Sequence, residues 1–504
     1  MPYNVSDIIK YYRSTDILAR ILEFCGVPHS LASNMGDTNP RLADSLELKR
    51  VFCAATTEYI SAYGSRLLEI TKKDHASMKS HCVGWVLDNG LDIHRSIWDK
   101  VYAIGALDVE YFSKSFPGEP YLMPERTFVL LEPVYQAILK IIHSYGIPLL
   151  VVTTGQGYNF DIFVKKDTPV YEDLVALGHV EHTLLYDYQH PSAKRGRAVP
   201  EQDGKAFDAI GKLFEFICYR IFMDLPNLGL SIPIVVGDVI CGNEKREAIS
   251  LDLSLYANPI HTRSVRCPFS VYSKHILKRH IVGDAVAKRV SYLFSIPRRT
   301  IEAELSLANT LSIRKDMNRA IQWAREVNTA IPDQTEGFSA LISEYKRSSL
   351  YAFHNEFERT RQDSISVWPQ TYDRFDLKSV PPCVAHPLRF PNPLLLQPTS
   401  IRHITRILMA MEWHPKHIAG LIHSKYARDY GWEVNFSRYD ANRWANVWVR
   451  IYAGMILSGI DGLTDLNCIS HQEKGEAWMG MRYCPKPWCG FNLADYRCLL
   501  FEKI

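Results

Sequence analysis

The sequence has no apolar run long enough to form a membrane-spanning helix. Its longest weakly charged apolar stretch, residues 225–242, contains the polar residues Asn227 and Asp238. Pro226 and Pro233 also interrupt this stretch, and a membrane span needs about 20 consecutive, mostly apolar residues. The composition therefore excludes a membrane protein of the helical class, and we expect no membrane partner.

Cysteine is scarce, with 11 residues in a chain of 504, and the number is odd. A scaffold stabilised by disulfides needs a much higher and usually even number, so the protein is expected in a reducing compartment. The N-terminal residues also lack the continuous apolar segment of a secretory signal. These absences together predict an intracellular protein, located in the cytoplasm or the nucleus.

The sequence also lacks internal repeats and low-complexity tracts, and it divides into regions of different character. A chain of 504 residues exceeds the roughly 250–300 residues at which one hydrophobic core stops growing. We expect an N-terminal helical region at 1–95, a mixed α/β core at 96–345 and a proline-rich linker at 346–398. The fourth region, at 399–504, is expected to be a small helical domain followed by a tail rich in cysteine and histidine. Ser400, Pro415 and Asp440 are typical of helix starts and predict helices near 401–412, 415–430 and 440–457.

Two expected strands of the α/β core carry acidic residues on their polar faces. In the segment 101–112, alternation places Asp108 and Glu110 on the same side of the strand. In the segment 249–256, leucines and isoleucine occupy one side and Asp252 lies on the other. Carboxylates that share a site repel one another unless a proton or a divalent cation lies between them. The alternative is that all three are ordinary residues on the solvent face of a half-exposed strand.

A turn rich in glycine and threonine lies between these two acidic strands. The segment 149–164 predicts a strand, the turn Thr153-Thr154-Gly155-Gln156-Gly157, and a second strand. Glycines allow close approach of the backbone, so amide and hydroxyl groups of such a turn can face an anion. A Gly-x-Gly turn is, however, also found in many simple hairpins.

A strongly basic segment follows the second acidic strand. Between residues 261 and 300 there are nine lysines and arginines and one acid, Asp284, whereas the whole chain has a net charge of only +3. Arg263, Arg266 and Lys274 lie closest to the strand. This concentration of positive charge favours a partner rich in phosphate.

These motifs, in this order, resemble those of the archaeo-eukaryotic primase superfamily, which includes primase small subunits and primase-polymerases. Asp108-Val109-Glu110 is similar to the first motif of that family, and the turn from Thr154 to Asn159 is similar to the second. Asp252 with Arg263, Arg266 and Lys274 is similar to the third. The resemblance covers about a third of the chain and implies an α/β (α+β) catalytic core of the primase type.

The resemblance implies a DNA primase or primase-polymerase that makes primers and extends them. Asp108, Glu110 and Asp252 would hold two Mg²⁺ or Mn²⁺ ions for phosphoryl transfer. The nucleoside triphosphate would be bound by a second set of residues, namely Thr154, Gly155, Gly157, Asn159, Arg263, Arg266 and Lys274. The expected partners are a single-stranded DNA template, nucleotides, and a helicase or other replication protein.

One position departs from the family pattern. Asn159 stands where the family usually has a histidine that contacts the nucleotide phosphates. Asparagine can donate a hydrogen bond but cannot carry charge, so phosphate binding would be weaker. A non-catalytic primase-fold protein that binds DNA or initiates replication therefore stays open. A metal-dependent nuclease stays open as well, because it also needs clustered carboxylates.

The C-terminal tail contains a possible set of zinc ligands. Cys468 and His471 form one close pair, and Cys484 and Cys489 form a second pair twelve residues further on. Two short spacings separated by one loop are typical of a structural zinc site, and primase-polymerases often carry such a module after the catalytic core. The alternative is that these cysteines are small buried apolar residues.

Overall fold

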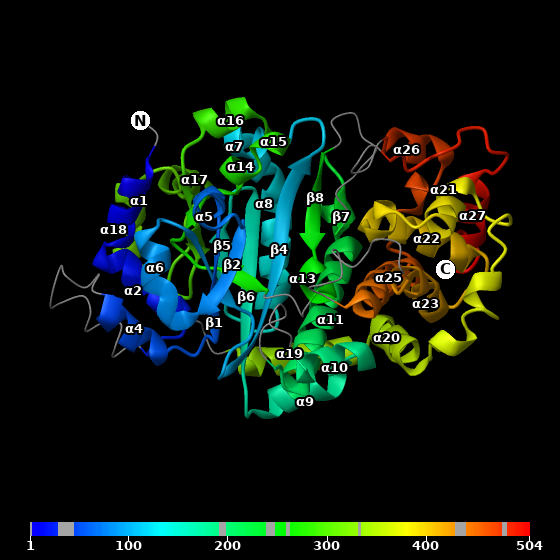
Figure 1. Ribbon diagram of the computed structural model, residues 1–504, viewed down its shortest axis with the longest axis horizontal. Helices are drawn as coiled ribbons and strands as arrows, with labels where there is room; N and C mark the ends of the chain where they lie inside the picture. The colour runs from blue at the N-terminus through cyan, green and yellow to red at the C-terminus, as the bar shows by residue number, and fades with distance from the viewer. Residues whose placement is uncertain are drawn as a thin grey trace.

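The computed structural model of the protein describes residues 3–28, 45–190, 198–237, 247–258, 263–330, 334–428, 440–475 and 481–504. A central sheet lies between an N-terminal α/β region on one side and a group of C-terminal helices on the other (Figure 1). The mixed α/β class that the sequence predicts is therefore confirmed.

The central sheet has six strands in the order β12-β5-β6-β4-β8-β7. Neighbouring strands are antiparallel, apart from the parallel pair β7 and β8. The strands are β4 (Tyr102–Ser113), β5 (Leu150–Thr153), β6 (Gly157–Lys165), β7 (Ile234–Val236), β8 (Glu247–Asp252) and β12 (Ile296–Arg299). β4 lies inside the sheet and hydrogen-bonds along its length to β6 and β8.

One face of this sheet is covered by the two longest helices, α8 (Pro124–His143) and α11 (Glu201–Met223). Tyr158 of β6 packs edge-on against Phe128 of α8, with 5.4 Å between ring centroids. On β4, a Cβ added to Gly105 would lie 2.4 Å from the Ile210 side chain of α11. The aromatic and aliphatic residues of this face form the core and leave the opposite face for polar groups.

The N-terminal region is not simply helical, as the sequence had suggested. It contains helices, but also β1 (Tyr59–Tyr63), β2 (His75–Lys79) and β3 (Asp92–Ser96). These join β9 (Ser264–Arg266) in a second sheet with the order β2-β1-β3-β9. The expectation of a helical region at 1–95 was wrong because these strands are only five residues long and their sheet is completed by a strand about 170 residues downstream.

The remaining elements of the α/β part are short. The small strands β10 (Val271–Tyr272) and β11 (Leu293–Phe294) pair with each other. The helices are α1 (Val5–Tyr12), α2 (Thr15–Phe24), α4 (Ser45–Cys53), α5 (Ser65–Thr71), α6 (Val83–Asp88), α7 (Glu119–Leu122), α9 (Pro169–Leu177), α10 (His182–Gln189), α12 (Leu225–Leu228), α13 (Ser254–Ala257), α14 (Lys274–Leu277), α15 (Arg279–Val282), α16 (Asp284–Arg289), α17 (Leu307–Ile313), α18 (Met317–Glu326) and α19 (Thr335–Lys346).

The three predicted C-terminal helices are present as α22 (Pro398–Ala410), α23 (Pro415–Tyr426) and α25 (Ala441–Leu457). Asp440 caps α25 by accepting a hydrogen bond of 2.6 Å from the backbone N–H of Arg443. α26 (Cys468–Glu473) and α27 (Leu493–Phe501) complete this unit. Pro415 and Asp440 located the starts of α23 and α25, whereas α22 begins at Pro398 and contains Ser400, the residue expected to cap it.

The proline-rich segment 346–398 is not an extended connector. It carries α20 (Ser349–Arg359) and α21 (Pro382–Arg389), and α20 packs against α23 and α25. Its proline Pro382 occupies the first turn of α21, where a missing N–H costs nothing. Trp368 and Tyr372 are buried under the C-terminal helices. The linker prediction was wrong, because Pro382, Pro393 and Pro398 begin helices and do not keep the chain extended.

A buried ionic network joins the central α11 to the C-terminal α25. Asp208 of α11 lies 2.6 Å from Arg443 and 3.3 Å from Arg450 of α25, and 3.1 Å from Lys212. Arg450 also pairs with Glu215. Burial alone would raise the pKa of Asp208, but the three surrounding cations outweigh it and hold the pKa well below its ordinary value. The network fixes the C-terminal helices to the sheet layer.

Replacing Asp208 with alanine should destabilise the protein by about 3–5 kcal/mol, because three buried cations lose their shared anion. Chemical denaturation at neutral pH measures this loss. The matched control is Asp173→Ala, which removes an exposed pair with Lys346 and should cost less than about 1 kcal/mol.

The difference between Asp208→Ala and wild type should shrink as the pH falls below about 4, where an unfolded aspartate gains its proton. A depressed pKa in the folded state stabilises the protein only above that range. Equal losses from Asp208→Ala and Asp173→Ala would contradict a central role for the network.

Candidate active site and metal centre

The three predicted carboxylates meet on one face of the central sheet. Asp108 of β4 lies directly opposite Asp252 of β8, and Glu110 lies two residues further along β4. On the other side, Asp108 lies opposite Asn159 of β6. All four positions are half-exposed, whereas the neighbouring residues of their strands are largely buried. The pairing of three strands thus brings these side chains together at an accessible place.

The pKa values of Asp108 and Asp252 are both raised, in part by the charge of Glu110. Burial raises the pKa of Asp108 well above its ordinary value, and the charges of Glu110 and Asp252 raise it further. Burial also raises the pKa of Asp252, although a backbone hydrogen bond of 2.8 Å from Ser254 opposes this. One carboxylate oxygen of Asp108, Oδ1, is buried without a hydrogen-bond partner among the described residues. The cluster therefore has excess negative charge that a cation or a proton would neutralise.

Glu110 is held by two neighbouring side chains. The ammonium group of Lys274 lies 3.4 Å from one of its oxygens, and the amide of Gln156 donates a hydrogen bond of 2.7 Å to the other. The charge of Glu110 is the main cause that raises the pKa of Lys274. Gln156, the central residue of the Gly-x-Gly turn, was not predicted from the sequence. It lies 46 residues from Glu110 along the chain, and only the packing of the hairpin against β4 brings the two side chains together.

The glycines of the turn are required by close packing. A Cβ on Gly157 would lie 1.8 Å from the backbone oxygen of Val109 in β4. A Cβ on Gly155 would lie 2.2 Å from the ring of Tyr272. Both distances are far below any van der Waals contact, so packing alone explains the two glycines. The turn lies beside the carboxylates because of this close approach to β4.

The remaining residues of the turn and of β6 lie at different depths. Thr154 closes the turn with a backbone hydrogen bond of 2.8 Å to Gly157, and its buried hydroxyl has no hydrogen-bond partner among the described residues. Asp161, on the same face as Asn159, is fully buried. Burial raises the pKa of Asp161 to about 8, although Arg95 opposes the shift. Asp161 is thus a buried group behind the accessible cluster.

The three predicted basic residues have separate structural partners. Arg263 donates a hydrogen bond of 3.1 Å to the backbone oxygen of Asn258. Arg266 lies 3.3 Å from Asp92, and its guanidinium group covers the ring of Tyr272 at 4.6 Å. The positive charges of Lys274 and Arg266 both lower the pKa of Asp108, so these two cations adjoin the acidic cluster.

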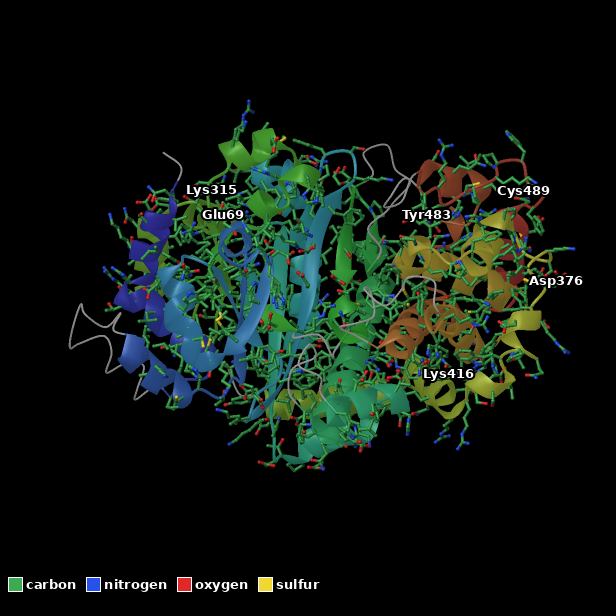
Figure 2. The ribbon with its side chains drawn as sticks, in the orientation of Figure 1. Glu69, Lys315, Asp376, Lys416, Tyr483 and Cys489 are labelled. Carbon is green, nitrogen blue, oxygen red and sulfur yellow. The ribbon has the colours of Figure 1, made fainter. Side chains whose placement is uncertain are left out.

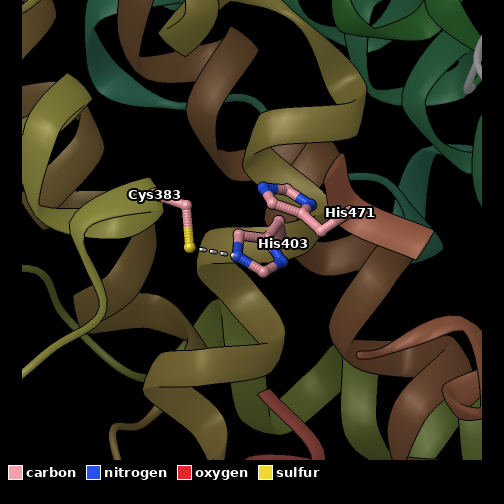
Figure 3. A group of neighbouring side chains, drawn as sticks. All are labelled: Cys383, His403 and His471. Carbon is pink, nitrogen blue, oxygen red and sulfur yellow. Dashed lines mark hydrogen bonds between the residues drawn. The ribbon is translucent and has the colours of Figure 1, made fainter. Parts of the chain in front are cut away.

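A second group of potential metal ligands lies among the C-terminal helices. The thiol of Cys383, at the start of α21, lies 3.2 Å from Nε2 of His403 in α22 (Figure 3). The ring of His471 in α26 stacks on His403 at 4.0 Å, and one ligand atom from each of the three residues lies within 4.8 Å of the others. Burial lowers the pKa of both histidines, which keeps them in the neutral form that binds metals. These residues could hold a metal ion.

This group differs from the predicted zinc ligands, of which it contains only His471. The other three, Cys468, Cys484 and Cys489, lie near enough to act on Cys383. Burial is the main cause that raises the pKa of the Cys383 thiol, and these three thiols raise it further. Figure 2 labels Cys489 and Tyr483 in this C-terminal region. Cys383 and His403 were missed because each is more than 60 residues from the predicted set, and only the fold brings them to it.

Comparison of the chain with protein-family models, with curated proteins and with solved structures gives no match. Among the described residues, the helices are too short or too polar to cross a membrane.

Replacing Gly157 with alanine should destabilise the protein by about 1–3 kcal/mol, because the added methyl group collides with the backbone of β4 and the strands must move apart. Gly462→Ala is the control, since nothing lies within 4 Å of its added Cβ and its φ is −68°. Thermal unfolding of both variants measures the difference. A Gly157→Ala protein as stable as wild type would show that the turn does not press on β4.

Proposed function

We propose that the protein is a template-dependent nucleotidyltransferase, a DNA primase or primase-polymerase, that makes and extends primers from nucleoside triphosphates. The observation that carries this proposal is the meeting of Asp108, Glu110 and Asp252 on adjoining strands, with Lys274 and Arg266 beside them. Clustered carboxylates next to cations suit a reaction that transfers a charged phosphoryl group.

The carboxylates fit hard divalent cations such as Mg²⁺ or Mn²⁺. Their ligand atoms would be oxygens, and the buried Oδ1 of Asp108 has no protein partner among the described residues. When bound, such ions activate the attacking hydroxyl and neutralise charge on the leaving pyrophosphate. The protein's own contribution is to hold Glu110 in place through Gln156 and Lys274 and to orient Asp252 through the backbone N–H of Ser254.

The basic residues favour a polymerase over a nuclease. A nuclease also needs clustered carboxylates, but it does not need cations arranged for a free triphosphate. Lys274 adjoins Glu110, and the charge of Arg266 lowers the pKa of Asp108 in the same cluster. The expected substrates are accordingly a single-stranded DNA template and nucleoside triphosphates, with a helicase or another replication protein as a functional partner.

A non-catalytic DNA-binding function is the second candidate, and the neutral side chain of Asn159 favours it. Asn159 lies directly opposite Asp108, so it borders the acidic cluster without contributing charge. Under this alternative the carboxylates would bind cations for structure and the protein would recognise DNA without extending it.

We further propose that the C-terminal group binds one structural zinc ion. Cys383, His403 and His471 supply sulfur and nitrogen ligands, the types that zinc prefers, and one of the nearby thiols of Cys468, Cys484 and Cys489 would be the fourth ligand. Four protein ligands complete the tetrahedral coordination of zinc, so no coordination position remains for a substrate. The ion would stabilise the packing of α21, α22 and α26.

Each of Asp108→Ala, Glu110→Ala and Asp252→Ala should reduce nucleotide incorporation at least about a thousandfold, because each removes a ligand of the divalent cations that would neutralise the transferred charge. The assay combines the full chain, a single-stranded template, dNTPs or NTPs, and Mg²⁺ or Mn²⁺. The melting temperature should be unchanged, since all three positions are half-exposed.

Glu172→Ala, at an exposed position of α9, is the matched control and should retain full activity. Wild-type incorporation in the three site variants would exclude the proposed catalytic role of the cluster. Template binding without incorporation by the wild-type protein would favour the non-catalytic alternative.

The purified protein should contain about one equivalent of zinc, and His403→Ala should lose it, because this change removes one of the grouped ligands. Elemental analysis measures the metal, and the control is His182→Ala on the exposed surface of α10. Loss of zinc should lower the melting temperature without abolishing extension of a pre-made primer. Less than a tenth of an equivalent in wild type would refute the site.

A further inference from the structure

The second sheet, β2-β1-β3-β9, has one face made almost wholly of polar residues. Strand register places Ser61 opposite both Ser77 and His94, and His94 opposite Arg266. Alternation along each strand then defines the rest of this face. Its members are Tyr59, Ser61 and Tyr63 of β1, His75, Ser77 and Lys79 of β2, Asp92, His94 and Ser96 of β3, and Ser264 and Arg266 of β9.

The opposite face of the same sheet supplies the core. Ile60, Ala62, Ile93 and Val265 are 0–2% exposed and belong to the main hydrophobic cluster. The hydrophobic effect therefore determines which side of the sheet is buried against the protein. It does not explain why the other side carries hydroxyl groups, imidazoles and cations next to the acidic cluster.

His94 lies at the centre of this polar face. Its ring packs at a tilt against Tyr63 with 4.3 Å between centroids, and it is only 9% exposed. Its Nε2 atom nevertheless has no hydrogen-bond partner among the described residues. A buried polar atom without a partner costs free energy, so a native site of this kind calls for a ligand.

The surroundings of His94 are positively charged. Burial is the main cause that lowers its pKa, and the charges of Arg266, His75 and Lys274 lower it further. The nearby carboxylate of Asp92 is already engaged by the backbone and hydroxyl of Ser273, at 3.1 and 2.9 Å, and by Arg266. In the tautomer that carries the proton on Nε2, His94 offers a hydrogen-bond donor beside these cations, an arrangement suited to an anion that accepts several hydrogen bonds.

This positive site is continuous with the acidic cluster. Arg266 covers the ring of Tyr272, and Lys274 reaches Glu110 at 3.4 Å. An anion bound at His94 would therefore lie next to the carboxylates that are proposed to hold divalent cations. Among phosphate-containing ligands, a nucleoside triphosphate suits such a boundary better than a strand, because its phosphates are themselves bridged by those cations.

We propose that the polar face of this sheet binds the triphosphate of the incoming nucleotide, and that His94 and Arg266 contact its phosphate oxygens. This inference rests on the proposed function, since it names the substrate site of that reaction. It adds His94 of β3 to Arg266, which the sequence resemblance had already assigned to phosphate binding.

Two substitutions at His94 distinguish a phosphate contact from simple packing. His94→Phe keeps the ring that packs on Tyr63 but removes both nitrogens, whereas His94→Gln removes the ring but keeps an N–H donor. The probe is inorganic tripolyphosphate with Mg²⁺, titrated calorimetrically into the full chain. His182→Phe, at an exposed position, is the matched control.

If His94 contacts phosphate, His94→Phe should weaken binding of tripolyphosphate by at least about tenfold, as expected for the loss of a hydrogen bond to a charged group, and His94→Gln should weaken it less. The melting temperature shows whether each variant is folded. If His94→Phe retains wild-type affinity, or if His94→Gln alone loses it, the ring only packs and the proposal is overturned.

A second titration with single-stranded oligothymidylate separates the two sources of phosphate. Loss of oligonucleotide binding in His94→Phe, with tripolyphosphate binding intact, would overturn the proposal in favour of a strand contact. Binding of tripolyphosphate needs no catalysis. If His94→Phe weakens this binding as expected but the wild-type protein makes no primers, the phosphate site is supported and the polymerase function is rejected. If the wild-type protein makes primers but His94→Phe binds tripolyphosphate as tightly as wild type, the polymerase is supported and the His94 site is rejected.

Discussion

The candidate site depends on the register of β4 between β6 and β8. Backbone hydrogen bonds hold Asp108 opposite Asp252 on one side and opposite Asn159 on the other, against the mutual repulsion of the carboxylates. A slip of one residue would turn the acids of β4 into the core beneath α8 and α11. Packing of the apolar face therefore fixes the charged face, and the protein holds together groups that would separate if they were free.

The sequence predicted those parts of the structure that local patterns determine. Alternation located Asp108, Glu110 and Asp252 on polar faces, and helix caps such as Asp440 located the C-terminal helices. The strand predicted at 249–256 ends at Asp252, because α13 begins two residues later. In each case the information lay within about ten residues of chain, which is the range over which periodicity and capping act.

Features made by distant segments were missed. The N-terminal sheet needs β9, and its strands are too short to produce a clear alternating pattern. Cys383 and His403 join His471 only through the packing of α21, α22 and α26. The segment 346–398 was misinterpreted because composition reports how many prolines a segment has, but not whether each one starts a helix. Local sequence identifies candidate chemical groups, whereas tertiary packing decides which of them become neighbours.

The ionic contact between α11 and α25 also bears on how the chain is made. Asp208 and Glu215 are synthesised more than 220 residues before Arg443 and Arg450, so the sheet layer must exist for a time without its C-terminal partner. A purely apolar contact would leave an apolar patch exposed to solvent during that interval, and such patches promote aggregation. Asp208 and Glu215 stay hydrated until the cations of α25 arrive, so this polar part of the contact adds no apolar surface to the nascent sheet layer.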